Sequence, residues 1–179
     1  MANYYFDIET TGLNPKTCKI ITIQFQKLNE FGDGVKGELV ILKAWESSER
    51  EILEKFIRMS GILESRWNFI PHGYNLRFEH NFLKEKTKLY GLPIIDILEG
   101  PFVDLHSVGI MMNGGKFKGS GLDNITGKVG DGLDVLEMWT FDAYDKIEEY
   151  IRREAKEYTK LYVWLKKRMP ELLREFRRE

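Results

Sequence analysis

Apolar and polar residues alternate along the first part of the chain with the period of two that β-strands have. Three such runs cover residues 3–9, 20–28 and 38–45, and the second is rich in β-branched side chains. Short segments with glycine, asparagine and proline separate the runs, which is typical of tight turns. Strands that follow one another through short turns pair side by side. The pattern therefore predicts a three-stranded antiparallel meander.

The pattern then changes to the three- and four-residue spacing of amphipathic helices. Residues 47–59 form the first of these segments, and Ser48 followed by Glu51 is the signature of a helix cap. Pro170 is expected to interrupt the last helix. The sequence predicts further helices over residues 76–90, 105–112, 122–126 and 141–168, with short strands at 68–75 and within 94–105.

A strand that is reached through a helix pairs parallel to its neighbour, so the sheet is expected to be mixed. Strands first, and then helices alternating with strands, indicate an α/β fold with helices on the faces of the sheet. We predict one domain over residues 1–168, followed by a charged helical tail over 169–179.

Composition excludes several classes of protein. The 179 residues carry a net charge of −1, so no overall positive field indicates a nucleic-acid partner. A single cysteine excludes an internal disulfide and a cysteine metal cluster. No stretch has the length and apolarity of a membrane span, so no membrane partner is expected and the predicted location is cytoplasmic.

Two acidic residues interrupt the apolar pattern of the first strand, F-D-I-E-T-T-G-L. Asp7 and Glu9 are two positions apart and should project from the same face of the sheet. Two neighbouring carboxylates destabilise each other unless a cation lies between them. The alternative is a pair of solvated acids on an edge strand, but the apolar flanks disfavour it.

Further acids lie at positions that could meet this pair. Glu79 stands at the start of a predicted helix, where a carboxylate is favoured electrostatically. Tyr150 and Glu154 are four residues apart and so share one face of the long helix. Spacing alone leaves open whether these groups converge, because each also fits an ordinary solvated or core-facing helix position.

Three motifs resemble those of the DEDD 3′–5′ exonucleases, which have a ribonuclease H-like fold. D-I-E-T-T-G-L is similar to the first motif, and G-Y-N-L-R-F-E to the second motif in the proofreading domains of family B DNA polymerases. Y-I-R-R-E resembles the third motif in its tyrosine form. Glu79 and Glu154 stand where the family has aspartate. Tyr144 and Glu148 offer a competing third motif with the same spacing.

The resemblance implies a ribonuclease H-like α/β protein with a mixed sheet of about five strands. Asp7, Glu9, Glu79 and Glu154 would hold two divalent ions, Mg²⁺ or Mn²⁺, and Tyr150 would orient the attacking water. The implied reaction is 3′–5′ exonuclease cleavage that releases nucleoside 5′-monophosphates. The family's substrate contacts fall on the following residues of this chain: Thr10, Thr11, Leu13, Asn75 and Phe78.

The implied partner is the 3′ end of single-stranded DNA or RNA, and the protein would act alone or with a separate polymerase or repair protein. Two other functions remain open at this point. The replacements at Glu79 and Glu154 also fit a catalytically weak or inactive module that binds nucleic acid or regulates a partner. The second open function is that of a scaffolding domain that dimerises through its charged C-terminal helix.

Overall fold

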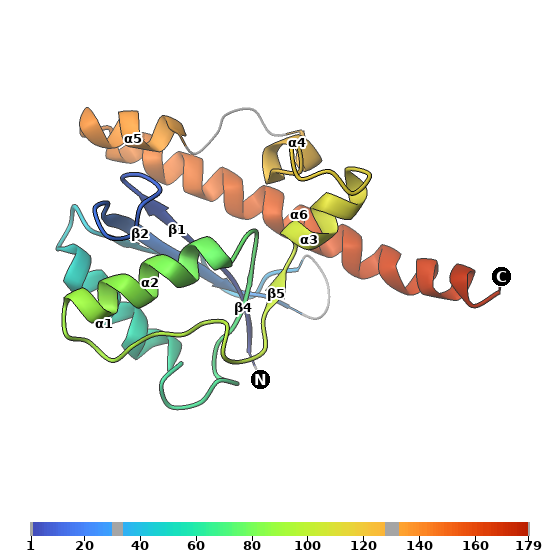
Figure 1. Ribbon diagram of the computed structural model, residues 1–179, viewed down its shortest axis with the longest axis horizontal. Helices are drawn as coiled ribbons and strands as arrows, with labels where there is room; N and C mark the ends of the chain where they lie inside the picture. Colours follow the sequence, from blue (N-terminus) through green and yellow to red (C-terminus); the bar gives the residue numbers. More distant parts are fainter. Residues whose placement is uncertain (1, 30–33, 128–132, 179) are drawn as a thin grey trace.

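A five-stranded mixed sheet forms the centre of the protein (Figure 1). The computed structural model describes residues 2–29, 34–127 and 133–178. The strand order is β3-β2-β1-β4-β5, with β1 antiparallel to β2, β2 antiparallel to β3, and β1, β4 and β5 parallel. The predicted meander and the predicted mixed sheet are confirmed. The strands are β1 Asn3–Thr10, β2 Ile20–Lys27, β3 Val40–Lys43, β4 Ile70–Gly73 and β5 Val103–Asp104.

The helices follow the sequence pattern closely until the C-terminal third. The predicted cap of α1 is present, because the backbone N–H of Glu51 donates to the Ser48 hydroxyl at 3.2 Å. Among the described residues, no helix combines the length and the apolarity needed to cross a bilayer. The helices are α1 Glu49–Ser60, α2 Arg77–Leu89, α3 His106–Met112, α4 Leu122–Thr126, α5 Leu133–Thr140 and α6 Tyr144–Phe176.

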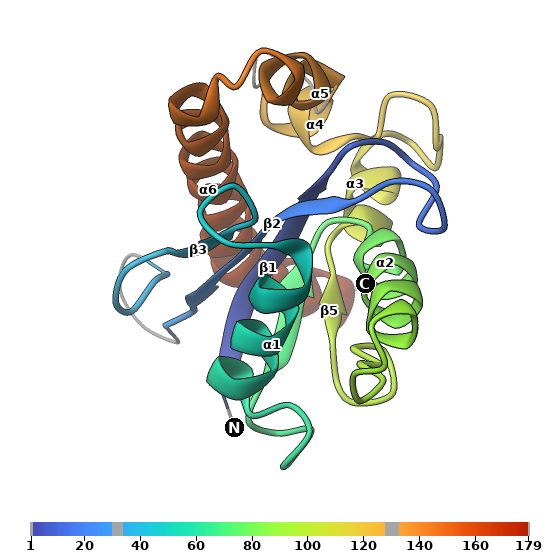
Figure 2. The ribbon, with the colours of Figure 1, turned by 90° about the vertical axis from the view of Figure 1, so that its left-hand side faces the viewer.

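The sheet separates two apolar layers, with α1 and α2 on one face and α6 on the other (Figure 2). Phe6 and Ile8 point into the first layer, where Phe6 stacks on Phe56 of α1 at a ring distance of 5.2 Å. Tyr5 points the other way and packs against Tyr158 of α6 at 4.9 Å. This alternation places Asp7 and Glu9 on the side of α6.

The C-terminal third departs from the sequence analysis in two ways. Helix α5 was not predicted, because a glycine-rich stretch precedes it. Val135 of α5 is nevertheless fully buried beside Ile21 and Ile147, so tertiary packing stabilises this short helix. The interruption at Pro170 is absent, since α6 continues to Phe176. Proline has no backbone N–H, so one carbonyl group in the preceding turn loses its helix hydrogen bond. Residues 166–170 are exposed, so water can reach that carbonyl group.

Candidate metal and active site

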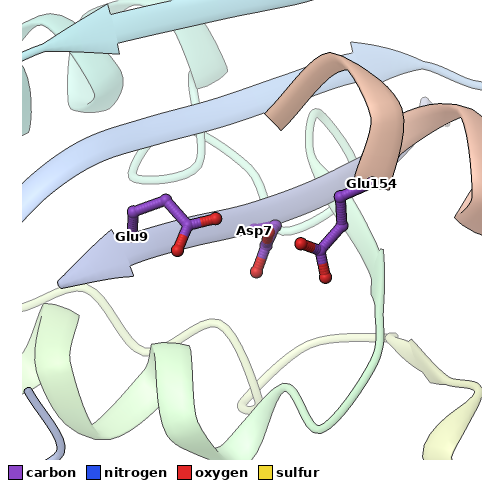
Figure 3. A group of neighbouring side chains, drawn as sticks. All are labelled: Asp7, Glu9 and Glu154. Carbon is purple, nitrogen blue, oxygen red and sulfur yellow. The ribbon is translucent and has the colours of Figure 1, made fainter. Parts of the chain in front are cut away.

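Strand β1 and helix α6 bring three carboxylates together on one face of the sheet. Asp7 and Glu9 project from β1, and Glu154 reaches them from α6 (Figure 3). One oxygen atom of each side chain lies within 4.8 Å of the others. The register of β1 shifts between Glu9 and Thr10, which ends the regular pairing just after the acidic pair. The predicted convergence of these three residues is therefore present.

Gln24 of β2 connects the two acids of β1, and no sequence pattern indicated this role. It lies directly opposite Asp7 in the antiparallel pair. Its Nε2 atom donates to Asp7 Oδ2 at 2.8 Å and more weakly to Glu9 Oε1 at 3.5 Å. The Thr22 hydroxyl donates to the amide oxygen at 2.9 Å, which fixes the orientation of the fully buried amide. The amide provides part of the positive field that two adjacent carboxylates require.

Glu79 joins the site from the first turn of α2. Its side chain is only 4% exposed, and burial, followed by the charge of Asp7, raises its pKa well above the ordinary value. The Glu79 carboxyl group therefore takes up a proton more readily than an exposed carboxyl group does, and it interacts with the Asp7 carboxyl group beside it. Its Oε2 atom receives no hydrogen bond from any donor in the described part of the chain. A buried carboxyl oxygen without a donor is costly, and a bound cation would remove that cost.

Burial and neighbouring charge also change the protonation of Asp7. Desolvation and then the negative charge of Glu154 raise the pKa of Asp7 from 3.8 to about 7, while the hydrogen bond from Gln24 acts in the opposite direction. In the absence of a cation, Asp7 is thus partly protonated at neutral pH. A carboxyl group whose charged form is this unfavourable gains most from a cation beside it.

Tyr150 and Glu154 share the face of α6 that is turned towards the sheet. Tyr150 is 5% exposed, and burial, followed by the charge of Glu154, raises its pKa well above the ordinary range. The phenol therefore stays protonated and donates its hydrogen to the Glu154 carboxylate. The competing pair lies elsewhere: Glu148 forms an ion pair with Lys43, and the ring of Tyr144 stacks on Trp45.

A cavity of about 360 Å³ unites these groups. All four acids and Tyr150 line it, together with three of the five residues predicted to contact substrate, Leu13, Asn75 and Phe78. Leu13 is 80% exposed and stands at the cavity's edge.

The other two predicted substrate contacts, Thr10 and Thr11, are not among the residues that line this cavity. Their hydroxyl groups instead fix the turn after β1. Thr10 donates to the carbonyl of Gly12 at 2.7 Å, and Thr11 accepts from the backbone N–H of Lys19 at 2.9 Å. The two threonines thereby hold the segment that presents Leu13.

Asp104, at the end of β5, positions the helix that carries Glu79. Its carboxylate accepts backbone N–H groups from Asn75 at 2.8 Å, from Leu76 at 3.0 Å and from His106 at 3.0 Å. Asn75 has a left-handed backbone with φ of 72°. The carboxylate holds this unusual turn and the start of α2 together. Sequence reasoning missed Asp104, although an acid at the end of a short strand was a signal for a cap.

The donor set fits a hard divalent cation. Its ligand atoms are carboxylate oxygens, which Mg²⁺ and Mn²⁺ prefer, and the group includes no cysteine or histidine. The raised pKa of Asp7 and the Glu79 oxygen without a donor are both features that a cation would relieve. Asp7, Glu9 and Glu154 would contact the ion, with Glu79 beside them.

Comparison with known sequences identifies the class of this protein. The sequence profile of the RNase H superfamily matches residues 4–166. The chain therefore belongs to the RNase H superfamily. An uncharacterized protein of Methanocaldococcus jannaschii is 27% identical over 183 residues, and the alignment covers 90% of this chain and 94% of that protein.

Solved structures of E. coli exonuclease I are similar in fold. One of them has a TM-score of 0.51 at 14% identity, and the match covers 72% of this chain and 35% of that one. The structure of the ExoI/SSB-Ct complex has a TM-score of 0.50 at 13% identity, with 71% and 36% covered. This chain thus spans about a third of the length of the exonuclease I structures that it matches. At these identities the likeness is one of fold.

Proposed function

We propose that residues 1–168 form a metal-dependent 3′–5′ exonuclease domain that releases nucleoside 5′-monophosphates. One observation carries the proposal: oxygens of Asp7, Glu9 and Glu154 lie within 4.8 Å of one another in a cavity that Glu79 and Tyr150 also line. Such a cluster of acids in a cleft, with pKa values shifted by burial and mutual charge, is typical of a functional site. Membership of the RNase H superfamily supports the same conclusion.

The motif resemblance extends the proposal to the tyrosine type of DEDD exonuclease. Glu79 and Glu154 stand where that family has aspartate, and each is longer by one methylene group. The placement of both residues at the cavity supports the view that the longer side chains still reach the ions. We propose Mg²⁺ or Mn²⁺ as the natural ions, two at a time.

The side chains at the cavity have two different roles in the proposed hydrolysis. The Tyr150 hydroxyl stays protonated, so it can donate to Glu154 and orient a water against the scissile phosphate. Asp7, Glu9, Glu79 and Glu154 supply the negative charge that holds the ions. The chemistry that divalent ions provide when bound is a lower pKa for water and compensation of charge on the phosphate oxygens.

The cavity edge supports a role in holding the end of a single strand of DNA or RNA. Leu13 is exposed and apolar, so it can insert against a terminal base, and Phe78 offers a ring for stacking. Asn75 presents its side-chain amide from the left-handed turn. Thr10 and Thr11 act through the turn that carries Leu13, and the backbone of that turn would contact the last nucleotide.

A 5′-fluorescein-labelled oligonucleotide tests the proposal, with DNA and RNA in parallel and Mg²⁺, Mn²⁺ or EDTA in the buffer. The expected result is a ladder of products that shorten from the 3′ end, with metal only. Asp7→Asn should abolish the ladder, and Glu148→Gln, on the same helix as Glu154 but away from the cavity, should not. If the protein instead binds single strands without metal and cleaves none of them, the conclusion would be that it is a binding module and not an enzyme.

A further inference from the structure

The loop between α3 and α4 carries an exposed aromatic ring between two lysines. Residues 113–120 read N-G-G-K-F-K-G-S, and we call them the Lys-Phe-Lys loop. Lys116 and Lys118 are exposed, and the exposed fraction of Phe117 is 75%. Neither lysine forms an ion pair with the described part of the chain. The loop therefore presents a ring and two positive charges that the fold itself does not use.

Hydrogen bonds fix the backbone of the Lys-Phe-Lys loop. The side-chain amide of Asn113 donates to the carbonyl of Lys116 at 2.8 Å and to that of Lys118 at 3.0 Å. The hydroxyl of Ser120 donates to the carbonyl of Phe117 at 2.7 Å. Three successive carbonyl groups are thus bound within the loop. A ligand that meets a backbone already ordered in this way loses less free energy to ordering on binding.

The Lys-Phe-Lys loop is attached to the wall of the acid-lined cavity. The hydroxyl of the fully buried Ser120 donates to Phe117, so it accepts from Nε2 of His106 at 3.0 Å. The Tyr74 hydroxyl donates to the carbonyl of Ser120. His106 and Tyr74 both line the cavity, as do residues 121–123, which follow the loop directly. The backbone that carries Phe117 is therefore bonded, through Ser120, to the cavity wall.

The loop and the turn after β1 belong to one side of the molecule. Figure 2 shows both segments projecting on the same side, and Figure 1 shows them at separate places along the long axis. Leu13 on that turn lines one part of the cavity, and residues 121–123 line another. A strand whose last base rests on Leu13 thus has a path through the cavity towards the Lys-Phe-Lys loop.

The cavity offers no positive side chain to the phosphates of a longer strand. Among the described residues that line it are Asp123 and the four acids of the metal site, but no lysine or arginine. Divalent ions would compensate the phosphate at the 3′ end only, because charge interactions in water fall off within a few ångströms. The Lys-Phe-Lys loop contains two lysines and no acid, so it supplies the missing charge next to the cavity.

We propose that the Lys-Phe-Lys loop binds a single-stranded nucleic acid a few nucleotides before its 3′ end. Phe117 stacks on a base, and Lys116 and Lys118 contact the neighbouring phosphates. The contact tolerates any base, since every base has a face that can stack, and it favours long strands over dinucleotides. This inference rests on the proposed function, because the cavity must hold the 3′ end.

An acidic segment of a partner protein is the alternative ligand for the two lysines. Such a segment would bring its carboxylates next to a cavity that is itself lined by acids, and like charges reduce affinity. The 3′ end of a strand is instead attracted by the ions that those acids would hold. A single strand therefore satisfies the loop and the cavity together.

Fluorescence anisotropy of a 5′-fluorescein-labelled 12-mer and a dinucleotide tests the loop in the full chain. EDTA in the buffer prevents cleavage and leaves the loop as the main contact. The 12-mer should bind more tightly than the dinucleotide. Phe117→Ala should weaken binding of the 12-mer about fivefold or more, and Phe117→Tyr should retain it. Phe176→Ala removes a ring of 74% exposure at the end of α6 and is the matched control.

Salt dependence tests the two lysines separately. Each phosphate contact contributes about 0.7 to the slope of log affinity against log salt, so Lys116→Gln/Lys118→Gln should lower the slope by about 1.4. Lys55→Gln/Arg58→Gln removes two exposed charges of α1 and should leave the slope unchanged. With Mg²⁺, Phe117→Ala should raise KM for the 12-mer and not lower kcat, because the loop lies outside the cavity lining.

Several results would overturn the role of the loop. One is equal affinity for the 12-mer and the dinucleotide, and another is the same behaviour of Phe117→Ala and Phe176→Ala. A fall in kcat without a rise in KM would indicate damage to the cavity. Displacement of the 12-mer by poly-glutamate as readily as by an unlabelled strand would indicate an acidic protein ligand.

The same measurements separate the loop from the proposed enzyme. Cleavage with a KM that Phe117→Ala does not change would remove the loop and leave the exonuclease. Binding of the 12-mer that depends on Phe117, in a chain that cleaves no strand with any metal, would remove the exonuclease and leave the loop.

Discussion

Asp7 and Gln24 lie directly opposite each other on β1 and β2, and the Gln24 amide donates to the Asp7 carboxylate at 2.8 Å. A neutral side chain thus stabilises an acidic cluster from the neighbouring strand. The amide is fully buried and is itself fixed by Thr22, so it cannot turn away to solvent. The strand register therefore decides how the acids are held before any cation arrives.

Replacing Gln24 by methionine should destabilise the metal-free protein. Methionine has a similar volume but no donor, so the buried acids lose their hydrogen bonds and the free energy of unfolding should fall by about 1–3 kcal/mol. Urea unfolding in EDTA measures the loss. Gln26→Met is the control, because Gln26 lies on the same strand but donates to the carbonyl of Gly37 at an exposed position. Saturating Mn²⁺ should reduce the deficit of Gln24→Met, and an unchanged deficit would contradict a cation at Asp7.

Glu154→Gln and Glu148→Gln should differ sharply in metal binding. Both residues lie on α6 six positions apart, but only Glu154 has an oxygen within 4.8 Å of the acids of β1. Loss of that ligand charge should weaken Mn²⁺ binding by about 10–100-fold and lower the rate of cleavage by at least as much. Titration calorimetry gives the first quantity and the oligonucleotide ladder the second. Equal metal affinity in the two variants would remove Glu154 from the site.

The stability of the metal-free protein should depend on pH through Asp7. Its pKa is about 7 in the folded protein and 3.8 ordinarily, so the folded state binds more protons between these values. Stability from this source is complete below pH 4 and is lost as the pH rises towards 7, by about 4 kcal/mol at most. Urea unfolding in EDTA at several pH values measures the slope.

Metal affinity should change in the opposite direction, because a cation binds the deprotonated carboxylate. Mn²⁺ binding should tighten as the pH rises from 5 to 7 and level off above that range. Asp7→Asn should flatten the pH dependence of stability and lose the metal response. Glu79 titrates together with Asp7, so the slope belongs to the pair. A slope of the opposite sign in the unmodified protein would refute a raised pKa at Asp7.

Asp104→Ala should loosen the start of α2. Three backbone N–H groups lose their acceptor, and the left-handed turn at Asn75 loses its support, so the free energy of unfolding should fall by about 1–2 kcal/mol. Hydrogen exchange at the amides of Asn75 and Leu76 should accelerate. Asp96→Ala is the control: Asp96 accepts one backbone N–H, from Leu98, and contacts His80 and Lys84 in the body of α2, so its loss disturbs α2 without touching the turn at Asn75. Equal acceleration at Asn75 in both variants would count against the role of Asp104.

The sequence by itself determined the features that depend on neighbours along the chain. The period of two gave β1, β2 and β3 and placed Asp7 and Glu9 on one face, and the Ser48 cap gave the start of α1. Steric alternation and hydrogen bonds within a few residues specify these features. The motif resemblance added the ribonuclease H-like fold, which the structure and the family match confirm.

Only the tertiary structure decided which distant groups meet. Gln24 became part of the site through cross-strand register, and Asp104 became the acceptor for the turn before α2 through the parallel pairing of β4 and β5. The placement of Tyr150 and Glu154 at the cavity, and not of Tyr144 and Glu148, depended on which strand each pair faces, because Glu148 pairs with Lys43 of β3. Both pairs have the same local spacing, so no local rule separates them. The two pairs differ in what they contact when a whole face of α6 is buried. The sequence pattern identifies that buried face, but it does not identify the strands that the face packs against.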